Sequence, residues 1–212
     1  MVRTMSELQI KSISAPFDRP PSALLALQLL SRAQTMGLLR ATIDESAVTL
    51  DRPTVLKVME RLQEAGLASA PAMRFRTAPD KDIAGLLQET IEALDASPYP
   101  SGEWEPLREL VGDELLARML RISESSVRRY GAGDRRTPDD VAWRLHAVGR
   151  IASALRGSYN SYGVRRWFER SRTALDGRTP TQIIAEAENE DEADLVRVIQ
   201  LAEALIGAGV AA

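Results

Sequence analysis

Hydrophobic residues recur every three or four positions along most of this chain, which is the spacing of helices with one buried face. The two clearest segments are 80–96, with Ile83 and Leu87 in register, and 138–156, with Val141 and Leu145 in register. The pattern predicts helices over residues 22–36, 43–50, 54–65, 80–96, 113–120, 124–130, 138–156 and 191–206. We therefore expect a mainly α-helical fold.

The clearest break in the pattern is Ser97–Gly102, where Pro and Gly disfavour both a helix and a strand ladder. We place the domain boundary there. The predicted organisation is a flexible arm over residues 1–20, a first domain over 21–97, a linker over 98–105 and a second domain over 106–212.

The helix over residues 22–36 is strongly apolar, with Ser22 as its expected N-cap and Gly37 at its end. It is too apolar for a surface helix, so it is expected to lie in a core or between two subunits. Together with the helix over 80–96, it offers more apolar face than a domain of this size readily buries. We predict a homodimer held by the N-terminal half.

Residues 113–130 are predicted to form two short helices joined by a tight turn. Leu115, Leu116 and Met119 form an apolar stripe on the first helix. Arg121 occupies the turn position that Gly often takes, so the turn must use a residue for which positive φ is costly. Ser123 is the expected N-cap of the second helix, and Val127 is the residue that turns inward.

This arrangement is typical of a helix-turn-helix, in which the second helix enters the major groove of double-stranded DNA. The alternative is an αα-hairpin with a purely structural role. If the segment reads DNA, the expected contacts come from Ser123, Ser125, Ser126, Arg128 and Arg129.

Residues 162–186 contain a helix with Arg166 and Trp167, a short loop, and the sequence Gly-Arg-Thr-Pro at 177–180. Gly177 suits a left-handed helix end, Thr179 suits an N-cap, and Pro180 suits a first helical position. With the paired Ile183 and Ile184, and a helix-turn-helix upstream, residues 107–206 resemble the Xre/MbcA/ParS antitoxin family.

The resemblance implies a toxin-binding region, whose partner in that family is a RES-domain toxin, an NAD-degrading enzyme. The adjacent Trp167 and Phe168 point about 100° apart on a helix, so we expect one of them to face a groove or a partner. The expected partner-binding residues are Trp167, Phe168, Arg178 and, in the C-terminal tail, Val210.

Residues 22–79 bear a weaker resemblance to winged-helix regulators of the MarR type. It rests on the segment 54–67, which ends in Leu62, Gly66 and Leu67, and on 68–77 as a two-stranded wing. The alternative is a helical dimerisation domain that does not touch DNA. The resemblance implies a second set of DNA contacts, from Arg52, Thr54, Lys57, Arg61, Arg74 and Arg76.

The charge of the chain is unevenly distributed. The net charge is −3, yet residues 118–178 carry 14 Arg against six acidic residues, and 186–203 carry seven acidic residues against Arg197 alone. A basic middle suits contact with phosphates. The acidic stretch is read as the solvated start of a helix.

Nothing in the sequence favours an enzyme. The only histidine is His146, expected to be a surface or packing residue, and neither a nucleophile elbow nor a phosphate-binding glycine loop is present. No cofactor or metal site is expected. The absence of Cys and of any long apolar run predicts a cytoplasmic protein that does not enter a membrane.

The sequence therefore predicts a DNA-binding transcriptional regulator of antitoxin type that binds its operator as a dimer and neutralises a RES-domain toxin. Two alternatives stay open. One is a free-standing regulator without a toxin, and the other is a protein-binding antitoxin whose helix-turn-helix is only structural.

Overall fold

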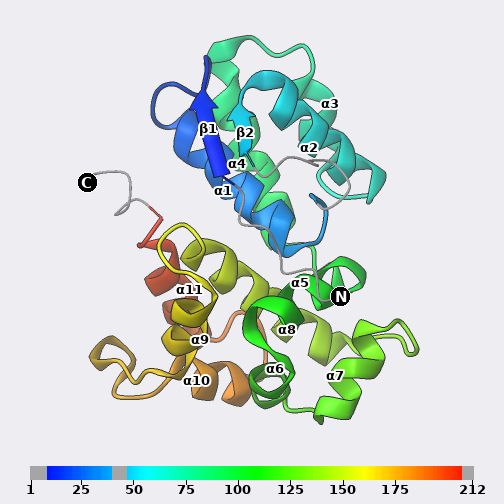
Figure 1. Cartoon of the computed structure of the whole chain (residues 1–212), viewed down its shortest axis with the longest axis vertical. Coiled ribbons are helices and arrows are strands. Elements are labelled where there is room, and N and C mark those ends of the chain that lie inside the picture. The colour runs from blue at the N-terminus through cyan, green and yellow to red at the C-terminus, as the bar shows by residue number, and fades with distance from the viewer. Residues whose placement is uncertain (1–8, 40–46, 207–212) are drawn as a thin grey trace. The chain divides into compact units, whose positions relative to one another are not determined.

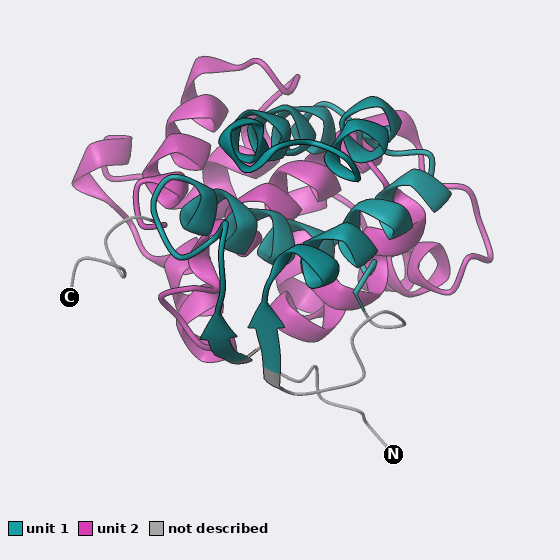
Figure 2. Cartoon of the chain, turned by 90° about the horizontal axis from the view of Figure 1, so that it is seen from above, with its two compact units in different colours: residues 1–97 teal, residues 98–212 magenta. Residues whose placement is uncertain are grey.

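The computed structural model describes residues 9–39 and 47–206. In these residues the chain is mainly helical, with eleven α-helices and one two-stranded sheet, which confirms the predicted fold class (Figure 1). The chain divides into two compact units, residues 1–97 and residues 98–212 (Figure 2). No helix of the described residues is both long and apolar enough to cross a bilayer.

The first unit starts with a strand, a helix and a second strand: β1 (Gln9–Ile13), α1 (Ser22–Thr35) and β2 (Ala47–Leu50). The strands run parallel, with Ile10 opposite Val48 and Ile13 opposite Leu50. A parallel pair needs a long crossover, and α1 lies in that connection. Two predictions are therefore wrong in the described residues. Residues 9–20 are not a flexible arm, because 9–13 form β1. The helix predicted over 43–50 is wrong for residues 47–50, which form β2. Residues 40–46 lie outside the described residues.

Residues 9–17 are held in place by burial as well as by strand pairing. Phe17, which follows β1, is fully buried in the first unit, as is Leu50 at the end of β2. α1 begins at Ser22 as predicted, but the Ser22 side chain is not a capping acceptor. Arg32 of α1 is also buried and forms an ion pair with Asp95 at 2.5 Å.

The rest of the first unit consists of α2 (Arg52–Glu64), α3 (Ser69–Phe75) and α4 (Asp80–Asp95). Asp51 caps α2 by accepting a hydrogen bond from the Thr54 amide at 2.9 Å. The predicted helix over 80–96 is confirmed by α4, in which Ile83 and Leu87 are fully buried.

The predicted two-stranded wing over residues 68–77 is wrong, because this segment contains α3. Residues 69–73 lack β-branched side chains, and Pro71 lies in the first turn, where a helix needs no amide donor. Phe75 is fully buried as the inward residue of this short helix. The alternation of Arg74 and Arg76 around Phe75 indicated a strand because the segment is short. Over so few residues, the two-residue period of a strand cannot be distinguished from the 3.6-residue period of a helix.

The second unit contains α5 (Pro100–Val111), α6 (Asp113–Leu120), α7 (Glu124–Gly131), α8 (Asp139–Leu155), α9 (Ser161–Glu169), the 3₁₀ turn η1 (Thr173–Leu175), α10 (Pro180–Glu186) and α11 (Ala193–Glu203). Most of the segment predicted as a linker, 98–105, belongs to α5. Pro100 starts this helix in the position where Pro is favoured, and Trp104 in its second turn is buried.

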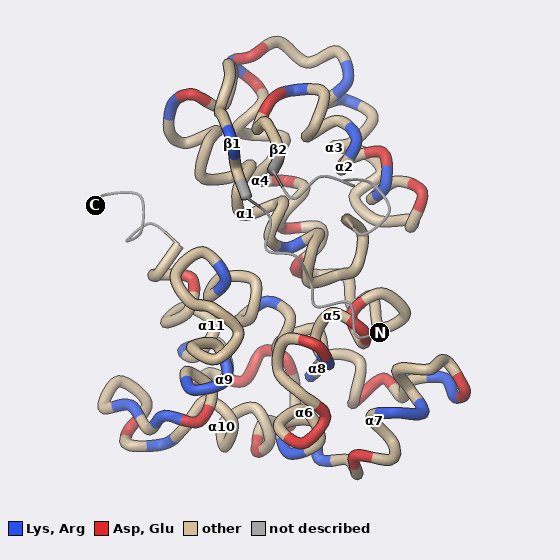
Figure 3. Tube along the Cα trace, viewed as in Figure 1, with Lys and Arg blue, Asp and Glu red and all other residues tan. Residues whose placement is uncertain are grey.

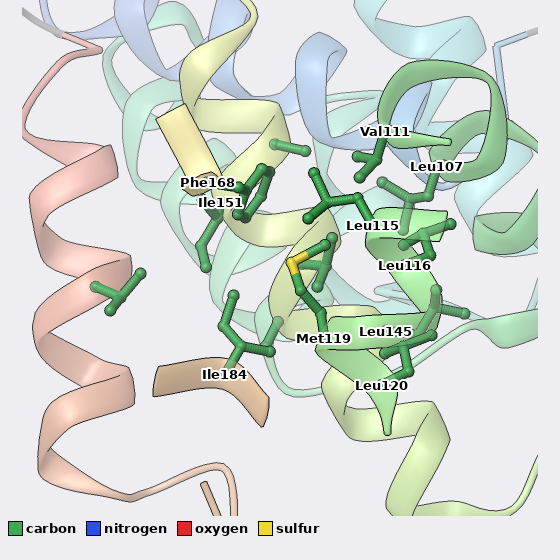
Figure 4. Packing of buried hydrophobic residues seen from close by; sticks show 14 of the residues in the cluster. Leu107, Val111, Leu115, Leu116, Met119, Leu120, Leu145, Ile151, Phe168 and Ile184 are labelled. Carbon is green, nitrogen blue, oxygen red and sulfur yellow. The ribbon is translucent and has the colours of Figure 1, made fainter. Parts of the chain in front are cut away.

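α8 is the central helix of the second unit and packs against α5, α6, α10 and α11. Because neighbours surround it, its buried residues lie on more than one face. Figure 4 shows side chains from several helices meeting in this core, among them Leu107, Met119, Leu145, Phe168 and Ile184. This core is the base on which α6 and α7 rest.

Candidate nucleic-acid interface

α6 and α7 form the predicted pair of short helices, and the turn between them is built around Arg121. This residue has φ of 55°, in the left-handed region. The Ile122 amide donates to the Ala117 carbonyl at 3.1 Å, which satisfies a carbonyl at the end of α6. Ala117 itself is buried, as expected for a small residue at a helix–helix contact.

The first residues of α7 are short polar side chains. Ser123 caps the helix as predicted, since its hydroxyl accepts a hydrogen bond from the Ser126 amide at 3.2 Å. Ser123 and Ser125 are exposed and Ser126 is half-buried. Three hydroxyls and one carboxylate, that of Glu124, therefore gather at the N-terminal end of α7.

α7 presents its basic side chains outward. Val127 is its buried residue and anchors the helix to the core, whereas Arg128 and Arg129 are exposed. Arg128 lies 3.4 Å from Glu124 and 3.7 Å from Asp113. Within the described part of the chain, Arg129 forms no ion pair. The predicted inward and outward faces of α7 are both confirmed.

The N-terminus of α6 is tied to α5 by an ion pair. Arg108 donates two hydrogen bonds to Asp113, at 2.8 and 3.1 Å, and this bonding raises the pKa of Arg108 above its ordinary value. Gly131 at the end of α7 leaves room for the Arg108 side chain, because a β-carbon there would lie 2.8 Å from Arg108 Cδ. Arg108 therefore packs beneath α7 while it holds α6.

Further basic residues lie in the loop that joins α7 to α8, residues 132–138. Arg135 and Arg136 are exposed there, and Arg136 lies 3.5 Å from Asp139. Figure 3 shows basic positions along α7 and in this loop, with acidic positions between them. These two arginines are not among the predicted contacts, although two adjacent Arg residues after a Gly-Asp turn were a usable signal.

The predicted DNA contacts of the first unit do not form a wing. Arg52 is turned toward its own unit, where it donates to the carbonyls of Phe75 and Ala78 at 3.0 and 2.5 Å. Its guanidinium also pairs with Asp80 at 3.2 Å, so it fastens the end of α3 to the start of α4. Thr54 is half-buried near the start of α2.

The other basic residues of that set are on the surface, and most face a carboxylate. Arg61 pairs with Glu64 and Arg76 with Glu60, at 2.7 and 2.8 Å, and Arg74 pairs with Glu89. Lys57 is exposed on α2. The structure thus spreads these charges over α2 and the end of α3, and the three arginines are paired with acidic neighbours.

In the segment that resembles a toxin-binding region, both aromatic residues are buried. Trp167 is 3% exposed and Phe168 is fully buried, with their rings edge to face at 5.6 Å. The prediction that one of them faces a groove is wrong. α9 packs against α5 and also against α10, so two directions about 100° apart both lead into the core.

Arg172, in the loop after α9, covers the ring of Trp167, with its guanidinium carbon 4.4 Å from the ring centroid. Burial lowers the pKa of Arg172 below its ordinary value, and the like charge of Arg170 adds to this effect. The surface over Trp167 is therefore a cationic side chain and not an exposed aromatic ring.

The Gly-Arg-Thr-Pro turn has the predicted local structure. Gly177 has φ of 80°, after Asp176 at 56°. Thr179 accepts a hydrogen bond from the Gln182 amide at 3.1 Å, the Gln182 side chain accepts one from the Thr179 amide at 2.8 Å, and Pro180 starts α10. The predicted helix start is confirmed.

Arg178 is bound within its own unit. It donates to Asp194 and lies 3.6 Å from Glu186, while Arg197 bridges Asp194 and Asp176 at 3.1 and 3.0 Å. The hydrogen bond from Arg178 lowers the pKa of Asp194 below its ordinary value, and Arg197 acts in the same direction. Val210, the fourth predicted partner residue, lies outside the described residues.

Two further features of the second unit are a buried histidine and a shallow groove. His146 is a packing residue, buried in α8 with its Nδ1 2.5 Å from Glu103 Oε1. A groove of about 450 Å³ is lined by residues of α6, α9 and α10 with mixed charges, including Arg118 and Glu169, which pair at 2.7 Å. In the part of the chain that the structure describes, no cluster of three or more metal-binding side chains occurs.

Comparisons with known proteins add no relative. No protein-family model matches the chain, and neither a curated protein nor a solved structure matches it.

Proposed function

We propose that this chain is a DNA-binding transcriptional regulator of antitoxin type, which reads operator DNA with α7. The observation that carries the proposal is the pair α6–α7. Two eight-residue helices are joined by a left-handed turn, and the second turns Val127 into the core while Arg128 and Arg129 point outward. In DNA-bound helix-turn-helix proteins, the N-terminal residues of the second helix reach the base edges.

The side chains at this end of α7 are of the kinds that read DNA. Arg128 and Arg129 supply forked donors, which suit the two acceptors of guanine or the oxygens of a phosphate. Ser125 supplies a hydroxyl that is donor and acceptor, and Glu124 supplies an acceptor that suits the amino group of cytosine. In the free protein Glu124 lies beside Arg128, so the two side chains must separate or share a base pair on binding.

One α7 contacts too few base pairs to select a site in a genome, and two-fold symmetry is the usual solution. We therefore propose that the regulator acts as a homodimer in the cytoplasm, where its DNA lies. The excess of Arg over acidic residues in 118–178 favours this use of the second unit, although the net charge of the whole chain is −3.

The test is DNA binding by Arg128→Ala/Arg129→Ala, measured by fluorescence anisotropy. The probes are duplexes that the full-length wild-type protein selects from a random pool, and the segment upstream of its own gene. Loss of a base contact costs about 1–3 kcal/mol, so we expect Kd to rise about 5- to 150-fold for each lost contact. The affinity should also fall less steeply with salt, because fewer counterions are released.

The matched control is Arg166→Ala/Arg170→Ala. It removes the same charge from two exposed arginines of the same unit, which form no ion pair within the described residues. We expect its Kd to stay within about threefold of wild type, as for charges away from the contact. Equal losses in the two double variants would refute reading by α7 and leave only general attraction between charges.

The antitoxin part of the proposal is supported by the resemblance of residues 107–206 and by the order of helix, loop, Gly-Arg-Thr-Pro turn and closing helix in α9–α11. Its test is growth rescue when the chain is expressed with the product of any neighbouring gene that encodes a RES-like protein. If Arg128→Ala/Arg129→Ala still rescues growth, neutralisation of the toxin does not depend on repression of the operator through α7. If no such gene adjoins this one, the free-standing regulator is the better proposal.

A further inference from the structure

Trp104 connects two parts of the candidate interface, α7 and the loop that joins α7 to α8. It belongs to α5, is 2% exposed, and lies behind α7. Its ring stacks on Tyr130 in the last turn of α7, with centroids 5.9 Å apart and the ring planes 23° apart. Its indole N–H donates to Thr137 Oγ1 at 2.9 Å, at the far end of the α7–α8 loop.

The loop between these two contacts carries Arg135 and Arg136. Its first end continues α7, since the Asp134 amide donates to the Arg129 carbonyl at 3.0 Å after the turn at Gly133. Its residues 132–136 are all exposed, and the half-buried Thr137 ties the second end of the loop to Trp104. One indole therefore holds both the end of α7 and the end of the loop.

We propose that Trp104 is a positioning residue that fixes the α7–α8 loop relative to α7, so that Arg135 and Arg136 contact the phosphate backbone of the DNA that α7 reads. This inference rests on the proposed function. Phosphate contacts set the register of a reading helix on the duplex, so a fixed loop contributes to both affinity and orientation. A loop without this anchor would lose more conformational entropy on binding, which would weaken its affinity for DNA.

The experiment removes the hydrogen bond between Trp104 and Thr137 from either side. Thr137→Val keeps the side-chain shape but takes away the acceptor of the indole N–H, and Trp104→Phe removes the donor but keeps a ring against Tyr130. Each phosphate contact contributes about 0.9 to the slope of log K against log salt. We expect either variant to flatten this slope by about 1 to 2 and to raise Kd about fivefold at moderate salt.

The mechanism is tested in the background of Arg135→Ala/Arg136→Ala. If Thr137 acts through these arginines, Thr137→Val has no further effect on Kd or on the salt slope in that background. Trp143→Phe is the matched control, because Trp143 is a half-buried tryptophan of the same unit and should leave the slope unchanged. Additive losses, or a wild-type slope in Thr137→Val, would overturn the proposal.

A measurement without DNA separates this inference from the proposed function. Amide hydrogen exchange of residues 129–137 should become faster in Thr137→Val, by a larger factor than exchange in α8, because the loop loses its anchor. Unchanged exchange overturns the positioning role even if the protein binds DNA. Faster exchange in a protein whose wild type selects no duplex from the random pool and does not bind the segment upstream of its gene overturns the proposed function, and with it the role of the loop in contacting phosphates.

Discussion

Arg121→Gly should make the second unit more stable, although it removes a charged side chain from the turn between α6 and α7. Arg121 is exposed and has φ of 55° and ψ of 39°. This left-handed conformation costs a non-glycine residue about 1–2 kcal/mol. Glycine adopts it freely but loses about 0.5–1 kcal/mol more conformational entropy on folding. The expected net gain in the free energy of unfolding is about 0.5–1 kcal/mol.

Arg121→Ala is the control that isolates the backbone term. Burial lowers the pKa of Arg144, and the like charge of Arg121 adds to this effect, so removing Arg121 relieves a repulsion whichever residue replaces it. Alanine loses the same charge as glycine but keeps the left-handed strain. The difference in stability between the glycine and alanine variants therefore measures the conformational cost at this position.

The assay is urea denaturation followed by tryptophan fluorescence. All three tryptophans, Trp104, Trp143 and Trp167, belong to the second unit, so the signal reports on that unit. The urea concentration at the midpoint should be higher for the glycine variant than for the alanine variant. The slope of the free energy of unfolding against urea concentration should be unchanged. A glycine variant that is no more stable than the alanine variant would refute the reasoning, because it would show that the turn stores no strain.

Two further predictions concern the region around the Gly-Arg-Thr-Pro turn. Trp167→Ala should destabilise the second unit by about 3–5 kcal/mol, because it leaves a cavity in the core, and the same urea assay measures this loss. A variant that keeps wild-type stability and only loses binding to a partner would contradict the buried position of Trp167. The pKa of Asp194 is lowered by the hydrogen bond from Arg178, so the stabilisation from this pair is present above the ordinary Asp pKa and is lost as the pH falls through the lowered value. Asp194→Asn should therefore flatten the acid side of the stability profile below about pH 4, and a profile identical to wild type would show that the pair does not contribute.

The sequence by itself determined those features that depend on residues within a turn or two of one another. Ser123 and Thr179 cap their helices as predicted, because a capping side chain bonds an amide two or three positions ahead. The inward position of Val127 and the outward position of Arg128 follow from helical spacing alone. These local signals were enough to locate the α6–α7 pair and the start of α10.

The tertiary structure decided which surfaces are covered and which charges remain available. β1 and β2 are too short to be recognised singly, and each is stabilised by a partner that lies 37 to 38 positions away in the sequence. Arg52 is of a residue type that often contacts DNA. In the fold, however, it donates hydrogen bonds to carbonyls at and just after the end of α3, which no pattern within α2 could predict.

Trp167 and Phe168 show the same limit at the site itself. Their directions on α9 were predicted correctly, but the conclusion that one must be exposed assumed that α9 packs on one side only. α5 and α10 cover both directions. In the same way, Trp104 makes its two contacts only because the fold brings Tyr130 to the face of its indole ring and Thr137 to its N–H. Spacing along the chain determines where a side chain points, and only packing between distant segments determines what it meets there.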